Sequence, residues 1–159
     1  MMKIYFANAL FSQADINYNA QLAAQIRHLS PQIDLYLPQE NNDINDKQAY
    51  ADSKMIAQAD TEKLLASDLV IAILDGNTID NGVASEIGVA YAQKIPIIGL
   101  YTDTRQQGAG NQQKLAALNQ VAENQFHYVN LYTTGLIKLN GTIVNNEADL
   151  LTAIKQKLN

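Results

Sequence analysis

The hydrophobic and polar positions of this chain alternate between a period typical of strands and one typical of helices. Residues 3–8 (KIYFAN) form a short run rich in β-forming side chains, and residues 12–30 follow with apolar side chains at helical spacing. Residues 33–38 (IDLYLP) return to the strand pattern. The polar stretch 39–47 (QENNDINDK) has no periodicity and predicts a loop, which could cover a site.

The alternation continues through the middle of the chain. A helical pattern over residues 48–66 precedes residues 67–76 (SDLVIAILDG), which are almost continuously apolar. A strand that is apolar on both faces is typical of the interior of a parallel sheet. A further helix is predicted over residues 80–93, and a further strand over residues 95–101 (IPIIGLY).

The last third of the chain predicts a more mixed structure. A loop rich in Gly and Gln over residues 102–113 leads to a helical segment over residues 114–124. Residues 126–144 are predicted to be extended, with a turn at Asn140-Gly141, and residues 146–158 form an amphipathic terminal helix.

Strands and helices that alternate in this way indicate the α/β class. We expect a doubly wound parallel sheet with helices on both faces and right-handed crossovers. A length of 159 residues is usual for one domain, and no internal boundary, repeat or low-complexity segment is apparent. The expected organisation is therefore a single domain over residues 1–159.

Composition narrows the possible partners. Eleven Lys and Arg stand against 16 Asp and Glu without any basic cluster, so the electrostatics oppose binding to a nucleic-acid polymer. The two His residues, His28 and His127, are far apart and no Cys accompanies them, so no metal is expected. No apolar run approaches the roughly 20 residues that span a bilayer. The start, MMKIYFA, is predicted to be a strand and not a signal sequence, so we expect a cytoplasmic protein.

Candidate chemistry is expected at the carboxyl ends of the strands, because doubly wound sheets bind ligands where the strand order reverses. The predicted strand ends are followed by residues 7–9, 39–40, 75–82 and 102–110. The third of these segments is the richest in carboxylates, and it leads into the helix that carries Glu86.

The acids of this segment allow two interpretations. Asp80 can be a helix N-cap, and Glu86 can be a solvated helical acid. However, the residues three and four positions from Glu86 are small or apolar, namely Gly82, Val83, Val89 and Ala90. Each glycine costs a helix about 1 kcal/mol and leaves room for a ligand or a neighbouring subunit to approach the backbone.

Other catalytic motifs are missing from the sequence. There is no nucleophile elbow, P-loop or GxGxxG pattern, and Ser85 has no nearby His to activate it. Carboxylate chemistry remains. A carboxylate nucleophile with a second acid nearby is suited to substitution at an anomeric carbon through an oxocarbenium-like transition state.

Three segments, KIYFAN, ADTEKLLASDLVIAILDG and DNGVASEIGVAYA, resemble the nucleoside 2-deoxyribosyltransferase family along nearly the whole chain. The spacing Asp80, Gly82, Glu86 and Gly88 carries most of this resemblance. It implies a flavodoxin-like sheet, a homo-oligomer that is commonly a hexamer built as a trimer of dimers, and no cofactor. It also implies an exchange reaction in which deoxyribose moves between nucleobases, with 2′-deoxynucleosides and free bases as the partners.

The resemblance also implies roles for single residues. Glu86 matches the nucleophile that attacks C1′ of the sugar, with Tyr5 beside it. Asp60 matches the acid that contacts and protonates the base, and Asp80 the one that holds the sugar hydroxyls. The substrate-binding positions further include Asn8, Gly82 and Asn124, the last matching an asparagine lent by the adjoining subunit.

The base specificity that the resemblance implies is a preference for purines. Residues 100–132 look closest to the purine-preferring branch of the family. Members that accept pyrimidines freely often end in a Tyr at the site, whereas this chain ends KQKLN. Purine-only exchange and exchange of both base classes stay open at this stage.

The implied mechanism is a retaining double displacement. Attack by Glu86 gives a covalent deoxyribosyl ester, and a second base then displaces the ester, so two inversions return the β anomer. Two alternatives remain. One is a nucleoside or nucleotide N-glycosidase of the same fold, although the segment ANALFSQ after the first strand lacks the Gly and Arg of a phosphate cradle. The other is a non-catalytic nucleotide-binding module, which burial of Glu86 in its own core would favour.

Overall fold

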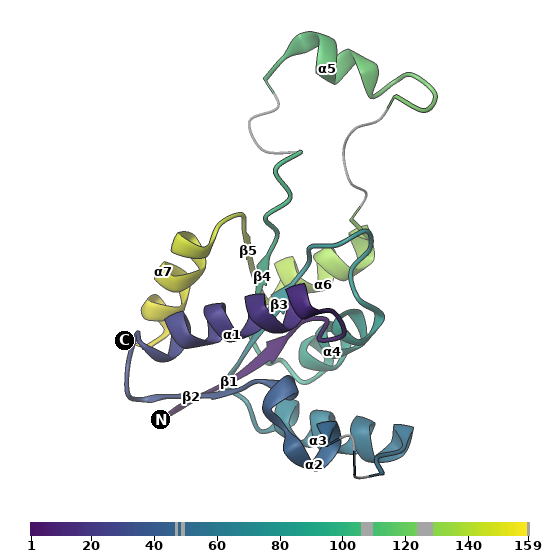
Figure 1. Ribbon diagram of the computed structural model, residues 1–159. Helices are drawn as coiled ribbons and strands as arrows, with labels where there is room; N and C mark the ends of the chain where they lie inside the picture. The colour runs from purple at the N-terminus through teal and green to yellow at the C-terminus, as the bar shows by residue number, and fades with distance from the viewer. Residues whose placement is uncertain (47, 49, 106–109, 124–128, 159) are drawn as a thin grey trace.

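Five parallel strands form an open sheet at the centre of the computed structural model (Figure 1). The structure describes residues 1–46, 48, 50–105, 110–123 and 129–158. The strand order is β2-β1-β3-β4-β5, in which the direction of winding reverses between β1 and β3. The predicted doubly wound α/β sheet is confirmed. The strands are β1 (Met2–Ala7), β2 (Ile33–Tyr36), β3 (Leu69–Ile73), β4 (Ile97–Leu100) and β5 (Gly141–Val144).

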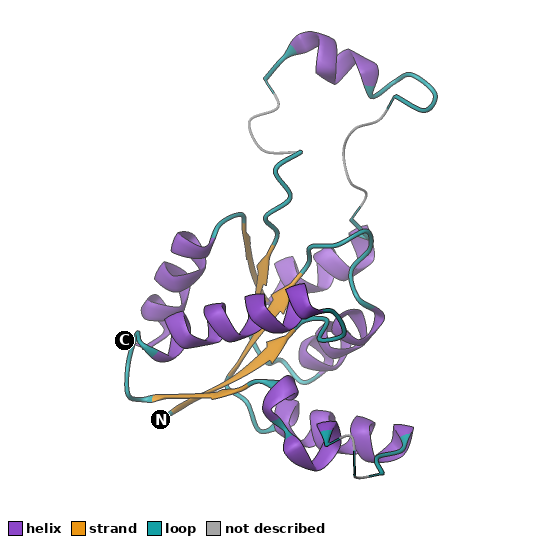
Figure 2. Cartoon of the chain, in the orientation of Figure 1, coloured by secondary structure: helices purple, strands orange, loops and turns teal. Residues whose placement is uncertain are grey.

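Helices cover both faces of the sheet (Figure 2). The alternation along β1 sends Ile4 and Phe6 to one face and Tyr5 and Ala7 to the other. The first face packs against α1 (Gln13–Arg27) and α7 (Glu147–Leu158). The second packs against α3 (Ser53–Leu65), α4 (Asn81–Ala92) and α6 (Leu131–Asn140).

The strand β3 is buried along its whole length, as predicted for the interior of a parallel sheet. Its neighbour β1 places Tyr5 opposite Val70 of β3 on one side and opposite Tyr36 of β2 on the other. Two tyrosines therefore lie side by side near the carboxyl end of the sheet, where the site is expected.

The loop predicted over residues 39–47 is partly helical. A 3-10 turn η1 (Pro38–Glu40) is followed by the one-turn helix α2 (Asn42–Asn45). Pro38 opens the first turn, and the Asn41 side chain caps the second by accepting from the Asp43 amide at 3.2 Å. One-turn helices of this kind depend on caps, so apolar periodicity does not show them. The helix expected over residues 114–124 is likewise short, since α5 is described as Gln112–Ala117.

The extended structure predicted over residues 126–144 is wrong for most of the described part of that stretch. Residues 131–140 form α6, and only β5 is a strand. The Asn130 side chain caps the helix by accepting from the Thr133 amide at 3.0 Å, and Leu136 and Ile137 pack on the sheet. The β-branched and aromatic residues of this stretch favour a strand locally, but the cap and the packing override that propensity.

The predicted turn at Asn140-Gly141 is the junction between α6 and β5. Gly141 lies so close to β4 that a Cβ atom there would stand 1.8 Å from the carbonyl oxygen of Ile97. Only glycine allows this approach. No helix within the described ranges is long and apolar enough to cross a membrane.

Candidate active site

The hydroxyl of Tyr5 and the carboxylate of Glu86 form a direct polar contact at the carboxyl edge of the sheet. Tyr5 is fully buried on β1 and donates a hydrogen bond to Oε1 of Glu86 at 2.5 Å. Glu86 is half-buried on α4, where the small neighbours of the helix leave one side of the carboxylate open to a cavity. The strand thus orients the acid while the cavity exposes it.

The environment shifts the proton affinity of Glu86. The pKa of Glu86 is raised to about 7. Burial is the largest cause, the hydrogen bond from Tyr5 opposes the rise, and the charges of Asp60 and Asp80 add to it. Burial and the negative charge of Glu86 raise the pKa of Tyr5, so its phenol remains a proton donor. Near neutral pH the carboxyl group of Glu86 can therefore exist in either form.

Asp60 is a second half-buried acid, on the neighbouring helix α3. It accepts a hydrogen bond from the hydroxyl of Tyr36 at 3.2 Å. Burial raises the pKa of Asp60, and the Tyr36 bond lowers it. A carboxyl group with a raised pKa can hold a proton at a pH where an exposed aspartate has lost it.

One cavity of about 270 Å³ brings three acids together. Asp60, Asp80 and Glu86 line it, and Asn8 and Gly82 complete its polar and small wall. The remaining wall is largely apolar, with contributions from Leu10, Phe11, Pro38, Ile44, Ile56 and Val83. A small polar ligand with one flat apolar part would suit such a lining.

The acids Asp60 and Glu86 are also reached from a second side. A depression of about 280 Å³ between α3 and α4 is lined by both acids and by Gly82. Ile56, which is 41% exposed, lines both spaces. The site of an isolated chain is therefore open along α3 and α4.

Asp80 is the N-cap of α4, and it also lines the cavity. Its Oδ1 accepts from the amides of Gly82 at 2.8 Å and Val83 at 3.2 Å. A Cβ atom at Gly82 would stand 2.9 Å from that oxygen, so glycine lets the cap lie close to the helix. Both capping bonds use one oxygen, and Oδ2 is left for a ligand hydroxyl. The two interpretations of Asp80 are compatible.

Asn8, at the end of β1, is held by a buried amide that sequence reasoning missed. Asn19 of α1 is 1% exposed and accepts from Asn8 Nδ2 at 2.7 Å. Its own Nδ2 donates to the carbonyl of Ala9 and to Oε1 of Gln39, both at 3.0 Å. Asn19 therefore ties the segment after β1 to the segment after β2, and both segments contribute to the cavity wall.

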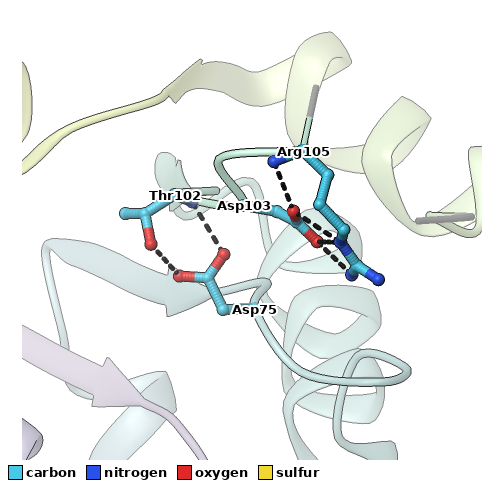
Figure 3. Close-up of polar contacts among 4 residues, drawn as sticks. All are labelled: Asp75, Thr102, Asp103 and Arg105. Carbon is cyan, nitrogen blue, oxygen red and sulfur yellow. Dashed lines mark hydrogen bonds and ion pairs between the residues drawn. The ribbon is translucent and has the colours of Figure 1, made fainter. Parts of the chain in front are cut away.

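A larger cavity of about 440 Å³ adjoins the first and shares Asn8 and Asp80 with it. Its acid Asp75 accepts from the amide and the hydroxyl of Thr102, both at 2.7 Å (Figure 3). Asp75 thus joins the ends of β3 and β4. The same view shows Arg105 paired with Asp103 further along the loop after β4. Asp75 is a structural clamp, in contrast to the three acids that line the smaller cavity.

Among the residues that the structure describes, no group of three His, Cys, Asp or Glu side chains is arranged to hold a metal ion. Of the three acids of the cavity, Asp60 lies on α3, Glu86 lies on α4, and Asp80 is the N-cap of α4. Asp60 and Glu86 each accept a hydrogen bond from a tyrosine, and Asp80 caps its helix. Three carboxyl groups, two of which have a raised pKa, therefore line one small space.

Comparison with known proteins identifies the family. A sequence profile described as nucleoside 2-deoxyribosyltransferase matches residues 4–145. The chain belongs to this family. No curated protein matches the chain. The expectation of one domain over residues 1–159 stays a prediction.

Three solved structures illustrate the similarity. A conserved protein from Enterococcus faecalis V583 is 72% identical, with 99% of each chain covered and a TM-score of 0.94. A 2-deoxyribosyltransferase from Bacillus psychrosaccharolyticus is 19% identical, with 94% of this chain and 90% of that chain covered and a TM-score of 0.62. A CMP N-glycosidase from Clostridium botulinum is 15% identical, with 98% of each chain covered and a TM-score of 0.51. The last two share the fold.

The structure brings together most of the residues expected at the family's site. Asn8, Asp60, Asp80, Gly82 and Glu86 line one cavity, and Tyr5 is bonded to Glu86. Asn124 lies outside the described residues.

Sequence reasoning missed two residues, Asn19 and Tyr36. Asn19 occupies the same helix face as Leu22, Ala23 and Ile26, so a polar residue at an apolar position was the signal for it. Tyr36 is the last residue of β2 and pairs with Tyr5 of β1, so the parallel pairing of the two strands could have been used to find it.

Proposed function

We propose that the protein is a nucleoside deoxyribosyltransferase that moves 2-deoxyribose from one nucleobase to another. The observation that carries this proposal is the Tyr5–Glu86 hydrogen bond at the wall of a cavity that also contains Asp60. Membership of the family supports it. The substrates are 2′-deoxynucleosides and free nucleobases, purines in preference, and the metabolic role is purine salvage in the cytoplasm.

In the first step Glu86 attacks C1′ of the sugar from the face opposite the base. The bond from C1′ to the base nitrogen breaks, its electron pair passes to the base, and Asp60 supplies a proton to the leaving base. The product is a deoxyribosyl ester of Glu86. The raised pKa of Asp60 favours the protonated acid that this step needs.

The ionised form of Glu86 is favoured by the Tyr5 hydroxyl, which donates to the oxygen of the carboxylate. Tyr5 also fixes the direction of the carboxylate, because Tyr5 itself is held by full burial in the sheet. Asp80 accepts a sugar hydroxyl through Oδ2, and Asn8 lies on the same wall. These contacts hold the anomeric carbon against the nucleophile.

In the second step a different base attacks C1′. The ester bond breaks, Glu86 is restored as a carboxylate, and Asp60 takes the proton that the incoming base releases. Each step inverts the anomeric centre, so the β configuration is retained. The residues of the chain suffice for this chemistry, and no cofactor takes part in it.

Hydrolysis is the second candidate, because a CMP N-glycosidase has the same fold. Water would then replace the incoming base. The segment after β1 argues against a nucleotide substrate, since it has no Gly or Arg, and the adjoining cavity contains Asp15 and Asp75. A non-catalytic binding module is less favoured, because Glu86 faces a cavity and not its own core.

A homo-oligomer, a hexamer built as a trimer of dimers, is proposed as the working form. The short helix α5 stands away from the sheet (Figure 1), and Val121 after it is 97% exposed. The depression between α3 and α4 leaves Asp60 and Glu86 open to a neighbour. Asn124 would complete the site of an adjoining subunit, as the family resemblance implies.

The deciding experiment incubates the protein with deoxyinosine, with and without adenine, and separates the products by chromatography. Exchange predicts deoxyadenosine and hypoxanthine when adenine is present, and only slow release of free deoxyribose without it, because the site must exclude water from the ester. Rapid release of deoxyribose that adenine does not change would overturn the transferase proposal in favour of hydrolysis.

A further inference from the structure

We propose that Tyr36 is a positioning residue for the base-protonating acid: its hydroxyl holds Asp60 in the orientation that proton transfer requires and adjusts how readily Asp60 gives up its proton. This inference rests on the proposed function for the role of Asp60. Tyr36 lines a separate cavity of about 580 Å³ formed by β2, α2 and α3, and not the cavity that contains Glu86. It would act on the reaction through Asp60 alone.

The pairing of β1 and β2 creates two parallel tyrosine–acid units. Tyr5 and Tyr36 are opposite each other in the register, with ring centroids 5.5 Å apart and planes inclined at 32°. Tyr5 donates to Glu86 of α4, and Tyr36 donates to Asp60 of α3. Two of the three acids of the cavity, Glu86 and Asp60, therefore each receive a phenol hydroxyl from a strand, which is more rigid than a loop.

The direction of the Tyr36 hydroxyl is fixed by Asn41. The amide Nδ2 of Asn41 donates to the phenol oxygen at 3.1 Å, while Oδ1 of Asn41 accepts from the Asp43 amide. An amide nitrogen can only donate, so it occupies a lone pair of the phenol oxygen. The single hydroxyl hydrogen of Tyr36 is left to point at Oδ1 of Asp60.

Charged groups around this pair come from several elements. Lys63, on the same helix as Asp60, places its ammonium 5.6 Å from the centre of the Tyr36 ring and helps to hold the ring. Glu86 of α4 lies close enough for its pKa to be raised by Asp60, and Asp80 lines the same cavity. The charge of Asp60 also raises the pKa of Tyr5 on β1. Within the described part of the chain, Tyr36 is the hydrogen-bond partner of Asp60.

The hydrogen bond from Tyr36 to Asp60 would affect the proton transfers of a two-step exchange. Asp60 must give a proton in the first step and take one in the second, so its pKa should lie near the working pH. Burial raises the pKa of Asp60, and the Tyr36 bond opposes that rise. Without Tyr36 the acid would hold its proton too firmly for the first step, in which it must give that proton to the leaving base.

The test replaces Tyr36 by Phe, which keeps the ring beside Tyr5 and under Lys63 but removes the hydroxyl. In the pH profile of kcat/KM for deoxyinosine–adenine exchange, the alkaline limb should move to higher pH by about one unit. At the pH optimum kcat should fall about tenfold, with little change in KM. The matched control is Tyr132→Phe, which removes an equivalent hydroxyl from a side chain 75% exposed on α6 and should change neither quantity.

A second variant, Asn41→Asp, keeps an acceptor for the cap of α2 but offers Tyr36 a competing carboxylate. The hydroxyl should turn away from Asp60, and the alkaline limb should again move upward. A uniform loss of rate in both variants, with the limb at the wild-type pH, would mean that Tyr36 is merely structural and would overturn the proposal.

A readout without substrate separates this inference from the proposed function. Carbon-13 NMR of the Asp carboxyl groups, assigned with Asp60→Asn, should show Asp60 titrating at higher pH in Tyr36→Phe than in wild type. If that shift is seen but wild type exchanges no base, the Tyr36–Asp60 coupling stands and the transferase proposal fails. If wild type exchanges bases and Asp60 titrates identically in both proteins, the inference about Tyr36 is wrong.

Discussion

Tyr5 and Glu86 are 81 positions apart in the sequence and 2.5 Å apart at their oxygen atoms. The strand β1 lies next to β3, and α4 follows β3. The fold therefore places the phenol of Tyr5 beside the carboxylate of Glu86, and both backbones are held in regular elements. A fully buried donor cannot readily turn elsewhere, and the acid is oriented before any ligand binds.

Tyr5→Phe should weaken exchange by about one to two orders of magnitude and move the acidic limb of its pH profile upward. The bond from Tyr5 lowers the pKa of Glu86, and its removal leaves burial unopposed. Because the nucleophile must be ionised, activity would begin only at a higher pH. The check is kcat/KM from pH 5 to 9 for wild type and variant. An acidic limb that stays in place would contradict this assignment of the nucleophile.

Glu86→Gln should increase the free energy of unfolding at alkaline pH. The folded pKa of about 7 lies above the ordinary value of 4.5, so ionisation of Glu86 lowers the free energy of unfolding. This loss is absent below pH 4.5 and complete above pH 7. The shift corresponds to a cost on the order of 3 kcal/mol. Urea unfolding at pH 4.5 and pH 8 measures it. The variant should gain stability over wild type at pH 8, and the gain should shrink towards pH 4.5.

The sequence predicts the sheet and its buried strand because apolar runs and periodicity are strong, local signals. It predicts α6 wrongly, because the β-branched residues there are locally ambiguous and only the cap at Asn130 and the contacts of Leu136 and Ile137 with the sheet decide for a helix.

The three acids that line the cavity were also named from the sequence, Asp80 and Glu86 from the segment that they share and Asp60 from the family resemblance. The hydrogen bonds that hold the residues of the cavity in place were not predictable from the sequence. The bonds from Tyr36 to Asp60 and from Asn19 to Asn8 join residues of different elements, and their pairing depends on the register and packing of the sheet. Such contacts are decided by tertiary structure, which no periodicity in the sequence encodes.

Asn19→Ala should both destabilise the protein and weaken substrate binding. The change removes three hydrogen bonds and leaves Asn8, Ala9 and Gln39 without their buried partner, which costs on the order of 2–3 kcal/mol. Loosening of the cavity wall should raise KM more than it lowers kcat. The matched control is Asn17→Ala on the exposed side of the same helix. Equal unfolding midpoints for the two variants would argue against a structural role for Asn19.

The proposed oligomer predicts that activity depends on association. Light scattering at micromolar concentrations should give a mass several times the 17.5 kDa of one chain. On dilution, specific activity should fall together with the mass, because Asp60 and Glu86 are open along α3 and α4 until a neighbour covers them. A monomer that keeps full specific activity would remove the adjoining subunit, and Asn124 with it, from the site.

The last prediction concerns the covalent step itself. The sugar carbon must come within about 3–3.5 Å of the Glu86 carboxylate, and the small residues of α4 leave that space open. Glu86→Ala should therefore abolish exchange and leave the far-ultraviolet circular dichroism unchanged, since the loss of a buried carboxylate removes a desolvation cost. A 2-deoxy-2-fluoro-arabinosyl nucleoside, whose fluorine slows turnover of the ester, should add the mass of one sugar to the wild-type peptide that contains Glu86. Asp60→Asn should serve as the companion variant, because it retains the nucleophile and should still acquire the label, more slowly. A label on the peptide of Asp60, or near-normal exchange by Glu86→Ala, would show that a different residue attacks the sugar.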